Sequence, residues 1–452
     1  MFNHNLPLVL TMWMVVVAIM GVARTRKHTA GVGLVLAYVL NMWLIHWAAS
    51  LLYVLPWYSG TGEALTVLGT EQSLYGICAF AFGSLALAPF LVDSGLLPRA
   101  RGVYLPDPRL PKAYLLIGAF FYILLSTALG TTPTLSAIIG AGQELTVVGL
   151  GLCWWQAWRS GNFSQMAFWL GVGLLPPLFT IVTRGFIGYG AVATLSVLIF
   201  ISNFVRSRVK VVVVGALLGY LAISVYVSYM RDRNEIRATV WGGQSLENRL
   251  DRLGQTANTF EWFDPWNQKH LERIDSRLNQ SYLAGAAVAF LDRTRDFARG
   301  ETLWDALVAL VPRFLWPGKT VTAGSGRLVT RFTGIQFDRT TSVGLGQVME
   351  FYVNFGTTGV IVGFMIFGVI ITTLDILATE RLANGDLHGF VLFYLTGISF
   401  LQVGGQLVEI TASAAGAIIV ALLVNRYLDR LQRKQVAPAA LSSGPPVMHA
   451  RI

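Results

Sequence analysis

Residues 347–375 read QVMEFYVNFGTTGVIVGFMIFGVIITTLD, a run whose only charged side chains are Glu350 and Asp375. A helix needs about 20 apolar residues to cross a membrane, because lipid cannot satisfy free backbone groups. Ten other stretches have a similar character. Together they predict an all-α polytopic integral membrane protein of about 11 transmembrane helices. The ten are residues 7–23, 31–55, 73–92, 112–130, 136–157, 166–183, 185–205, 211–230, 387–402 and 406–425.

The composition agrees with this class. Of 452 residues, 54% are hydrophobic and 13% are charged, whereas soluble domains are about a quarter charged. A soluble enzyme, a nucleic-acid-binding domain and a disordered scaffold are therefore excluded. The net charge of +10 is explained by basic cytoplasmic loops. Cys78 and Cys153 fall in separate apolar runs, and the six histidines lack HxH or HExxH spacing, so no disulfide framework, metal site or other cofactor is expected.

The distribution of Lys and Arg predicts the orientation. The short loops on one side, together with the tail, hold seventeen of these residues, and the short loops on the other side hold only Arg184. Cytoplasmic loops are enriched in Lys and Arg. We therefore expect the N-terminus outside and the C-terminus in the cytoplasm. Four regions follow: helices one to eight in residues 1–230, a large outer loop in 231–346, helices nine to eleven in 347–425, and a basic, partly disordered cytoplasmic tail in 426–452.

The large loop is expected to have helical structure of its own. Residues 245–260 have helical spacing, with Ser245 as a candidate N-cap. Residues 266–299 look like a second helical stretch, in which the apolar run 281–291 is too short to span. The stretch 317–346, rich in Gly, Thr and Ser, is expected to be an irregular basic loop.

Arginines beside apolar segments are the first candidate site residues. Guanidinium is permanently charged and binds phosphate bidentately. Arg184 interrupts two apolar runs in TRGFIGYG, and a charge at membrane depth is costly. Arg313 and Lys319 flank a Pro-Gly turn in VPRFLWPGK. The alternatives are that Arg184 extends to the membrane surface, and that the loop arginines pair with the thirteen acidic residues of 231–346.

Other candidates are an acid, a histidine and several aromatic residues. Glu350, Tyr352 and Asn354 begin the ninth predicted span. Glu350 suits a general base or an arginine partner, or simply an acid that a helix start favours. His270 suits a general base, or is a solvated loop histidine. The loop also holds five tryptophans, Trp262 and Trp266 among them, which suit sugar stacking or anchoring at the membrane interface.

The chain resembles the O-antigen polymerase family, the Wzy-type polymerases of oligosaccharide repeat units. The resemblance rests on ten to twelve spans, one dominant outer loop late in the chain, and three short motifs. These motifs are Thr183–Gly185, Pro312–Lys319 and Glu350–Gly356. In topology the resemblance covers the whole chain. It implies a GT-C-like membrane glycosyltransferase of the bacterial inner membrane with a periplasmic loop.

The resemblance also implies a substrate and roles. Such an enzyme transfers a growing glycan from undecaprenyl diphosphate to a new lipid-linked repeat unit, making a surface polysaccharide or exopolysaccharide. Its partners would be the lipid-linked oligosaccharide, membrane lipid, and a chain-length regulator and a flippase of the same pathway. The leaving group is a diphosphate, which arginines stabilise without a metal. Arg184, Arg313, Arg277, Arg327 and Lys319 are the candidates for binding it. Glu350 or His270 would act on the acceptor hydroxyl, and Trp262, Trp266, Tyr352 and Asn354 would contact sugar.

Three other functions fit the sequence. A ligase-like enzyme would transfer the glycan to a different acceptor with the same architecture. A lipid-linked glycan transporter would show charged or broken helices at mid-membrane. A non-catalytic assembly subunit would use the loop as a docking surface. The sequence favours an enzyme, because the predicted spans are nearly free of charge away from their ends.

Overall fold

The computed structural model describes residues 5–26, 31–97, 102–125, 133–205, 207–311, 315–316, 318–319, 325–337 and 343–442. All regular secondary structure in these residues is helical. The elements are α1 Leu6–Arg26, α2 Leu34–Met42, η1 Trp43–Ala48, α3 Ala49–Leu51, η2 Leu52–Val54, α4 Glu63–Phe82, η3 Gly83–Leu87, α5 Ala88–Asp93, α6 Leu110–Leu125, α7 Pro133–Gln143, α8 Leu145–Arg159, α9 Phe163–Gly173, α10 Pro176–Arg184, α11 Gly188–Ser202, α12 Arg208–Trp241, α13 Leu246–Asn258, α14 Gln268–Leu278, α15 Gln280–Thr294, α16 Glu301–Ala309, α17 Ser325–Thr333, α18 Gln347–Ala383, α19 Leu387–Ser399 and α20 Leu407–Ser442.

Eight helical stretches within the described residues are long and apolar enough to cross a membrane. They are Leu6–Arg24, Leu34–Val54, Glu63–Asp93, Leu135–Arg159, Phe163–Arg184, Arg208–Trp241, Gln347–Ala383 and Leu407–Arg433. Three further apolar helices, α6, α11 and α19, are shorter. Each of the eleven predicted stretches overlaps one of these helices. The class of helical, membrane-embedded protein is therefore confirmed, and the number of 11 crossings stays a prediction.

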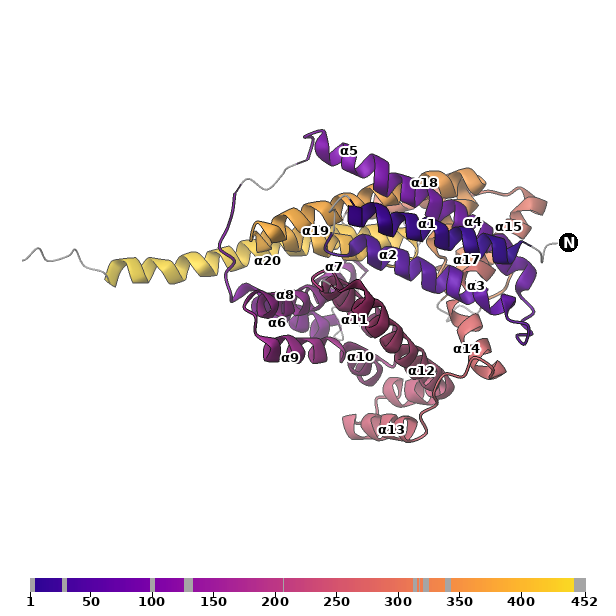
Figure 1. Ribbon diagram of the computed structural model, residues 1–452, viewed down its shortest axis with the longest axis horizontal. Helices are drawn as coiled ribbons and strands as arrows, with labels where there is room; N and C mark the ends of the chain where they lie inside the picture. Colours follow the sequence, from indigo (N-terminus) through magenta and orange to yellow (C-terminus); the bar gives the residue numbers. More distant parts are fainter. Residues whose placement is uncertain are drawn as a thin grey trace, which may run out of the picture.

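The two ends of the bundle carry different parts of the chain (Figure 1). The start of α1 lies at the same end as α14, whereas the free end of α20 lies at the opposite end. We call these the loop end and the tail end. At the tail end, the Gln432 side chain of α20 donates to Asp107 at 2.8 Å. The orientation of these two ends toward the membrane, and the compartment that each end faces, stay predictions.

The apolar run at 281–291, expected in the outer loop, forms most of α15 and packs against α4. A Cβ on Gly285 would lie 1.7 Å from the carbonyl oxygen of Leu65, and one on Gly69 would lie 1.9 Å from that of Ser281. Such close approach requires small residues at both helices. An apolar run that is too short to span a membrane can still pack between longer helices. The length of the run 281–291 therefore did not predict that it packs on α4.

α18 is not one straight helix. Its backbone leaves helical geometry at Phe355 and at Gly356, where φ is 61° and ψ is −150°. The Phe351 ring lies 5.5 Å from the Phe367 ring, whereas a straight helix would separate these residues by about 24 Å. Residues 347–354 therefore fold back along the rest of α18, and we call them the re-entrant segment. The single predicted span therefore contains two helices of opposite direction. A hydropathy profile cannot detect such a reversal, because it depends only on how apolar the residues are.

The re-entrant segment begins inside the bundle. The N–H of Gln347 donates to the carbonyl of Val403 at 3.0 Å, and the N–H of Gly346 donates to that of Gly404 at 3.2 Å. The Tyr38 hydroxyl donates to the side chain of Gln347. We call residues 343–347 and 400–406 the interior junction. Irregular backbone at membrane depth is tolerated where protein or a water-filled cavity surrounds it.

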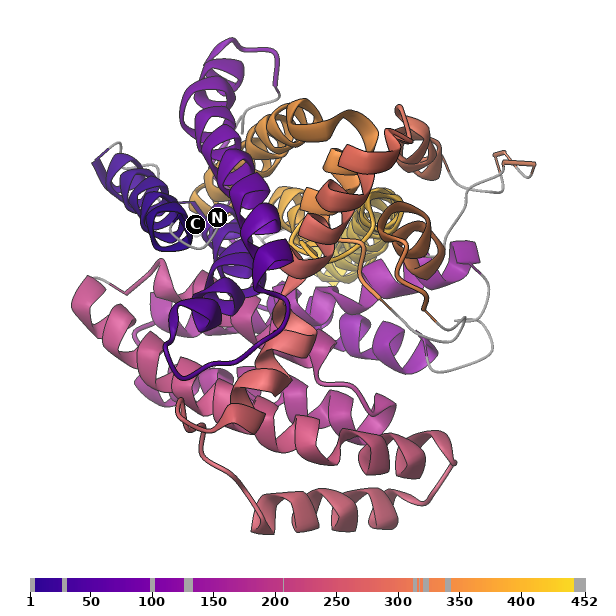
Figure 2. The ribbon, with the colours of Figure 1, turned by 90° about the vertical axis from the view of Figure 1, so that its right-hand side faces the viewer.

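α12 extends beyond the bundle at the loop end. Ile223 and Tyr226 of α12 pack on a cluster of Leu52, Leu271 and Ile274, which joins the end of the second span to α14. From this cluster α12 continues for about four more turns. α13 packs beside this projecting part and lies at the lower edge of both views (Figures 1 and 2).

Candidate functional site

The projecting part of α12 carries two polar faces. A helix turns by about 100° per residue, so positions three and four apart share a face. Ser228, Arg231, Asp232 and Glu235 therefore lie on one face. The opposite face carries Tyr226, Tyr229, Arg233 and Arg237. The two faces differ in how their arginines are paired.

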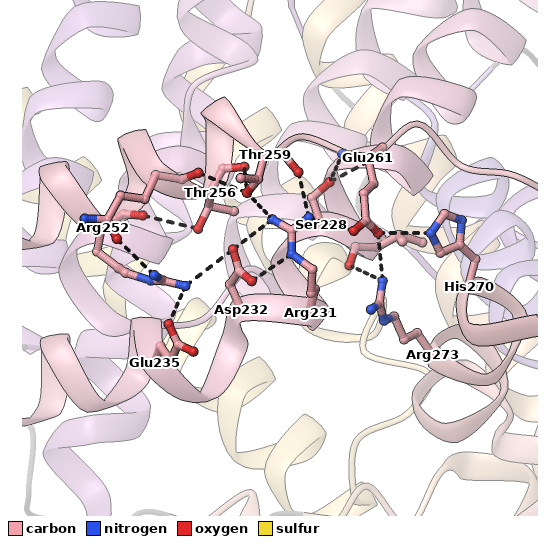
Figure 3. A network of polar contacts seen from close by, with 12 residues as sticks. Ser228, Arg231, Asp232, Glu235, Arg252, Thr256, Thr259, Glu261, His270 and Arg273 are labelled. Carbon is pink, nitrogen blue, oxygen red and sulfur yellow. Dashed lines mark hydrogen bonds and ion pairs between the residues drawn. The ribbon is translucent and has the colours of Figure 1, made fainter. Parts of the chain in front are cut away.

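The first face forms a network of ion pairs with α13 (Figure 3). Arg231 lies 2.8 Å from Asp232 and 2.8 Å from Glu261. Arg252 of α13 lies 2.6 Å from Glu235 and 3.5 Å from Asp232. These arginines are balanced by carboxylates. They hold α13 on α12, as the alternative interpretation of the loop arginines expected.

Glu261 is the centre of the same network. Besides Arg231, it contacts Arg273 at 3.2 Å and His270 Nε2 at 3.1 Å. Hydrogen bonds from Arg231, then from His270 and Arg273, lower the pKa of Glu261 from an ordinary 4.5 to about 2. His270 is buried, and its Nδ1 accepts from the N–H of Asp264 at 3.1 Å. Both ring nitrogens are therefore engaged within the protein, and a role for His270 as a base stays a prediction.

A stripe of hydroxyls on α12 binds the chain around Glu261. The Ser228 hydroxyl accepts from the N–H of Glu261 at 3.0 Å, and the Ser224 hydroxyl accepts from the N–H of Phe263 at 3.0 Å. The Tyr220 hydroxyl donates to the carbonyl of Phe263 at 3.1 Å. The sequence analysis missed this stripe. It could have been found from the sequence, because hydroxyl residues occur every four positions along an otherwise apolar stretch.

The opposite face of α12 gathers arginines without acids. Arg233 lies within electrostatic reach of Arg237 and of Arg277 on α14. The Arg237 guanidinium lies 4.2 Å from the centre of the Phe186 ring. In the described part of the chain, none of these three arginines forms an ion pair. Clustered like charges repel, so this face is electropositive and suited to an anion. We call Arg233, Arg237 and Arg277 the arginine face.

The Arg184–Gly185 turn packs against the arginine face. The carbonyl of Gly185 accepts from the Tyr229 hydroxyl at 2.8 Å and from Arg237 Nε at 3.4 Å. The carbonyl of Arg184 accepts from Trp241 Nε1 at 3.1 Å. Gly185 has a φ of 72°, in the left-handed region that favours glycine. This explains the glycine of the Thr-Arg-Gly motif.

The Arg184 side chain turns back into the bundle. Its guanidinium lies 4.0 Å from the centre of the Tyr122 ring and donates to Gln143 Oε1 at 3.0 Å. It also lies within electrostatic reach of Glu144. The structure therefore brings the backbone of Arg184 to the arginine face, while its charge is held by aromatic and polar groups beneath it.

Glu350 and Asn354 lie in the re-entrant segment, and both are fully buried. Glu350 Oε2 accepts from the N–H of Leu407 at 2.7 Å, which caps the start of α20. Asn354 donates to the Thr302 hydroxyl at 2.7 Å and accepts from the N–H of Gly300 at 2.9 Å. These contacts join α18 to α16 and α20. Within the described part of the chain, their hydrogen bonds do not reach the arginine face, and their proposed roles toward substrate stay predictions.

The remaining candidates lie on separate elements. Arg313 lies outside the described residues. Lys319 donates to the carbonyls of Val308 and Val311, and Arg327 is exposed on α17. The other three are aromatic: Tyr352 contacts Phe297, Trp262 stacks on Tyr220, and Trp266 stacks on Trp57. Among the residues described, no three His, Cys, Asp or Glu side chains are placed to hold a metal ion.

The comparisons with known proteins give one match. Residues 101–431, about three quarters of the chain, match a family described as a domain of unknown function, DUF8712. No curated protein and no solved structure matches. The matched range contains the whole of α12 to α18, and with it the arginine face, the Glu261 network and the re-entrant segment. The chain belongs to the DUF8712 family.

Proposed function

We propose that this protein is a membrane-embedded glycosyltransferase of the bacterial inner membrane. It transfers a glycan from undecaprenyl diphosphate to the next lipid-linked repeat unit at the outer face, and so builds a polysaccharide. One observation carries the proposal: the arginine face is a cluster of cations without acidic partners among the described residues, on the part of α12 that extends beyond its contact with the second span. The headgroup of a lipid-linked substrate lies at this level.

The chemistry needs a stabiliser of negative charge. An acceptor hydroxyl oxygen bonds to the anomeric carbon as the bond from that carbon to the diphosphate oxygen breaks. The electron pair leaves with the diphosphate, and the hydroxyl proton passes to a base. Preorganised cations lower the barrier because charge develops on the leaving group. Arg233 and Arg277 supply this charge, and Arg237 supplies it beside the Arg184–Gly185 turn.

Matched arginine variants test this proposal. Arg233→Ala and Arg277→Ala, each made in a strain lacking the wild-type gene, should leave single repeat units on the lipid carrier and no polymer. Arg252→Ala, which removes a paired arginine of α13, is the control and should still give polymer. Membrane levels of every variant are measured by immunoblot. Full-length polymer from both test variants, at wild-type protein levels, would overturn the proposal.

A second candidate is a transporter of lipid-linked glycans, which the interior junction favours. Broken helices that meet inside a bundle are typical of transporters. The deletion strain separates the candidates. Repeat units trapped on the cytoplasmic side indicate transport, and complete polymer stranded on the carrier indicates a ligase. Single repeat units at the outer face indicate the polymerase.

A further inference from the structure

A cavity of about 570 Å³ lies on the other face of α12 from the arginine face. Its lining includes Glu261, Trp262, Lys269, His270 and Arg273. The wall is rigid, because Glu261 is bonded to three neighbours and His270 is buried. The proposed glycan transfer does not use this cavity.

Aromatic pairs place the cavity at the edge of the membrane. The Trp262 ring stacks on Tyr220 of α12, with ring centres 5.8 Å apart, and the Trp266 ring stacks on Trp57, with centres 5.9 Å apart. Both tryptophans are exposed. Trp and Tyr concentrate at the level of the lipid headgroups. Trp57 also lies just beyond the end of a membrane-spanning stretch.

The surface below the cavity is apolar and uncovered. Val213 and Leu217 of α12 are 52% and 66% exposed. They continue the stripe of Tyr220, Ser224 and Ser228 at helical spacing. A molecule with an acyl chain can therefore rest on α12 while its head enters the cavity.

One cation of the cavity lining has no carboxylate partner among the described residues. Arg231 is paired with Asp232 and Glu261, and Arg273 is paired with Glu261, so these two arginines have little charge left for a ligand. Asp264, the other carboxylate of the lining, accepts from the N–H of Trp266. Lys269 forms no ion pair with any described residue and is exposed. Its ammonium is a free positive charge at the headgroup level, where each such charge attracts anionic lipid.

We propose that this cavity binds the phosphate headgroup of an anionic lipid, with the acyl chain lying along Val213 and Leu217. The chemistry recognised is a lipid phosphate. A membrane phospholipid and a polyprenyl diphosphate both carry it. The proposed glycan transfer does not require this site. The lipid-binding proposal can therefore fail while the proposed function holds, and the reverse is also true.

The test uses the full chain in nanodiscs of phosphatidylcholine containing a small fraction of photoactivatable phosphatidylglycerol. Mass spectrometry should map crosslinks to residues 261–273 and to 213–221. Unlabelled phosphatidylglycerol should compete with them, and phosphatidylcholine should not. Lys269→Gln should weaken the labelling about fivefold, since one lysine near the surface contributes about 1 kcal/mol. Lys210→Gln, at the other end of α12, is the control and should leave it unchanged.

A second competition identifies the source of the phosphate. Displacement by phosphatidylglycerol alone identifies a phospholipid site, and stronger displacement by undecaprenyl diphosphate identifies the carrier lipid. Both results support a lipid-phosphate site. Labelling that is absent from 261–273, equal for phosphatidylcholine and phosphatidylglycerol probes, or unaffected by Lys269→Gln would overturn it.

Discussion

Pairing separates the arginines of this protein into two groups at the scale of single residues. Arg231, Arg252 and Arg273 are held by carboxylates, and a paired arginine has little charge left for a ligand. Arg233 and Arg277 have no such partner in the described chain. The sequence alone could identify Arg184 and Arg277 as candidates, but it could not show which arginines are paired with carboxylates. Which arginine meets an acid depends on how α13 and α14 return to α12, and local spacing does not encode that.

Glu261 gives a pH-dependent prediction at the same scale. Its pKa falls from 4.5 to about 2 on folding, so the stabilisation is complete above pH about 4.5 and is lost as the pH falls toward 2. The carboxylate is 37% exposed, and solvent screening reduces its contribution to about 1 kcal/mol. The protection factors for hydrogen exchange of residues 246–264, each taken relative to the unfolded chain at the same pH, should fall as the pH is lowered across this range. Glu261→Gln should show faster exchange at neutral pH and a weaker dependence. Equal dependence in both proteins would contradict the assignment.

The elements show where hydropathy is informative and where it is not. Every predicted apolar stretch overlaps a helix, because burial in lipid demands both apolar side chains and satisfied backbone. The direction in which the chain runs within a stretch, and the helix against which a stretch packs, were not predictable. The reversal at Phe355 and Gly356 lies inside a continuous apolar run. The packing of α15 on α4 depends on Gly69 and Gly285, which lie far apart in the chain.

The reversal in α18 makes Gly356 sensitive to substitution. Its φ of 61° and ψ of −150° belong to a region that is essentially restricted to glycine. Gly356→Ala should destabilise the protein by about 1–3 kcal/mol and lower its thermal unfolding temperature in detergent. Gly219→Ala is a matched control, because Gly219 lies in α12 with no atom within 4 Å of an added Cβ. It should unfold at or above the wild-type temperature. Equal unfolding temperatures for the two variants would show that the chain does not reverse at Gly356.

At the scale of the whole molecule, the charge bias of the sequence gives a prediction about the two ends of the bundle. The start of α1 and the end of α12 lie toward the loop end, and the basic helix α20 extends from the tail end (Figure 1). The positive-inside rule predicts that the tail end faces the cytoplasm. The interior junction shows that the helices are not all full-length parallel spans, since α19 is only 13 residues long and ends inside the bundle. The connection from α19 to α20 accepts backbone hydrogen bonds from Gly346 and Gln347 there.

Cysteine labelling tests this orientation. Cys78 and Cys153 are free thiols, so both are first replaced by serine. Single cysteines are then placed at Gln244, exposed beyond α12 at the loop end, and at Ser94, exposed beyond α5 at the tail end. A membrane-impermeant maleimide should label Gln244→Cys in intact spheroplasts, because the charge bias predicts that the loop end faces outward. It should label Ser94→Cys only after the membrane is permeabilised. The reverse pattern would place the arginine face in the cytoplasm, where a glycan polymerase of the proposed kind would have no substrate. Labelling of both in intact spheroplasts would mean that the membrane does not separate the two ends.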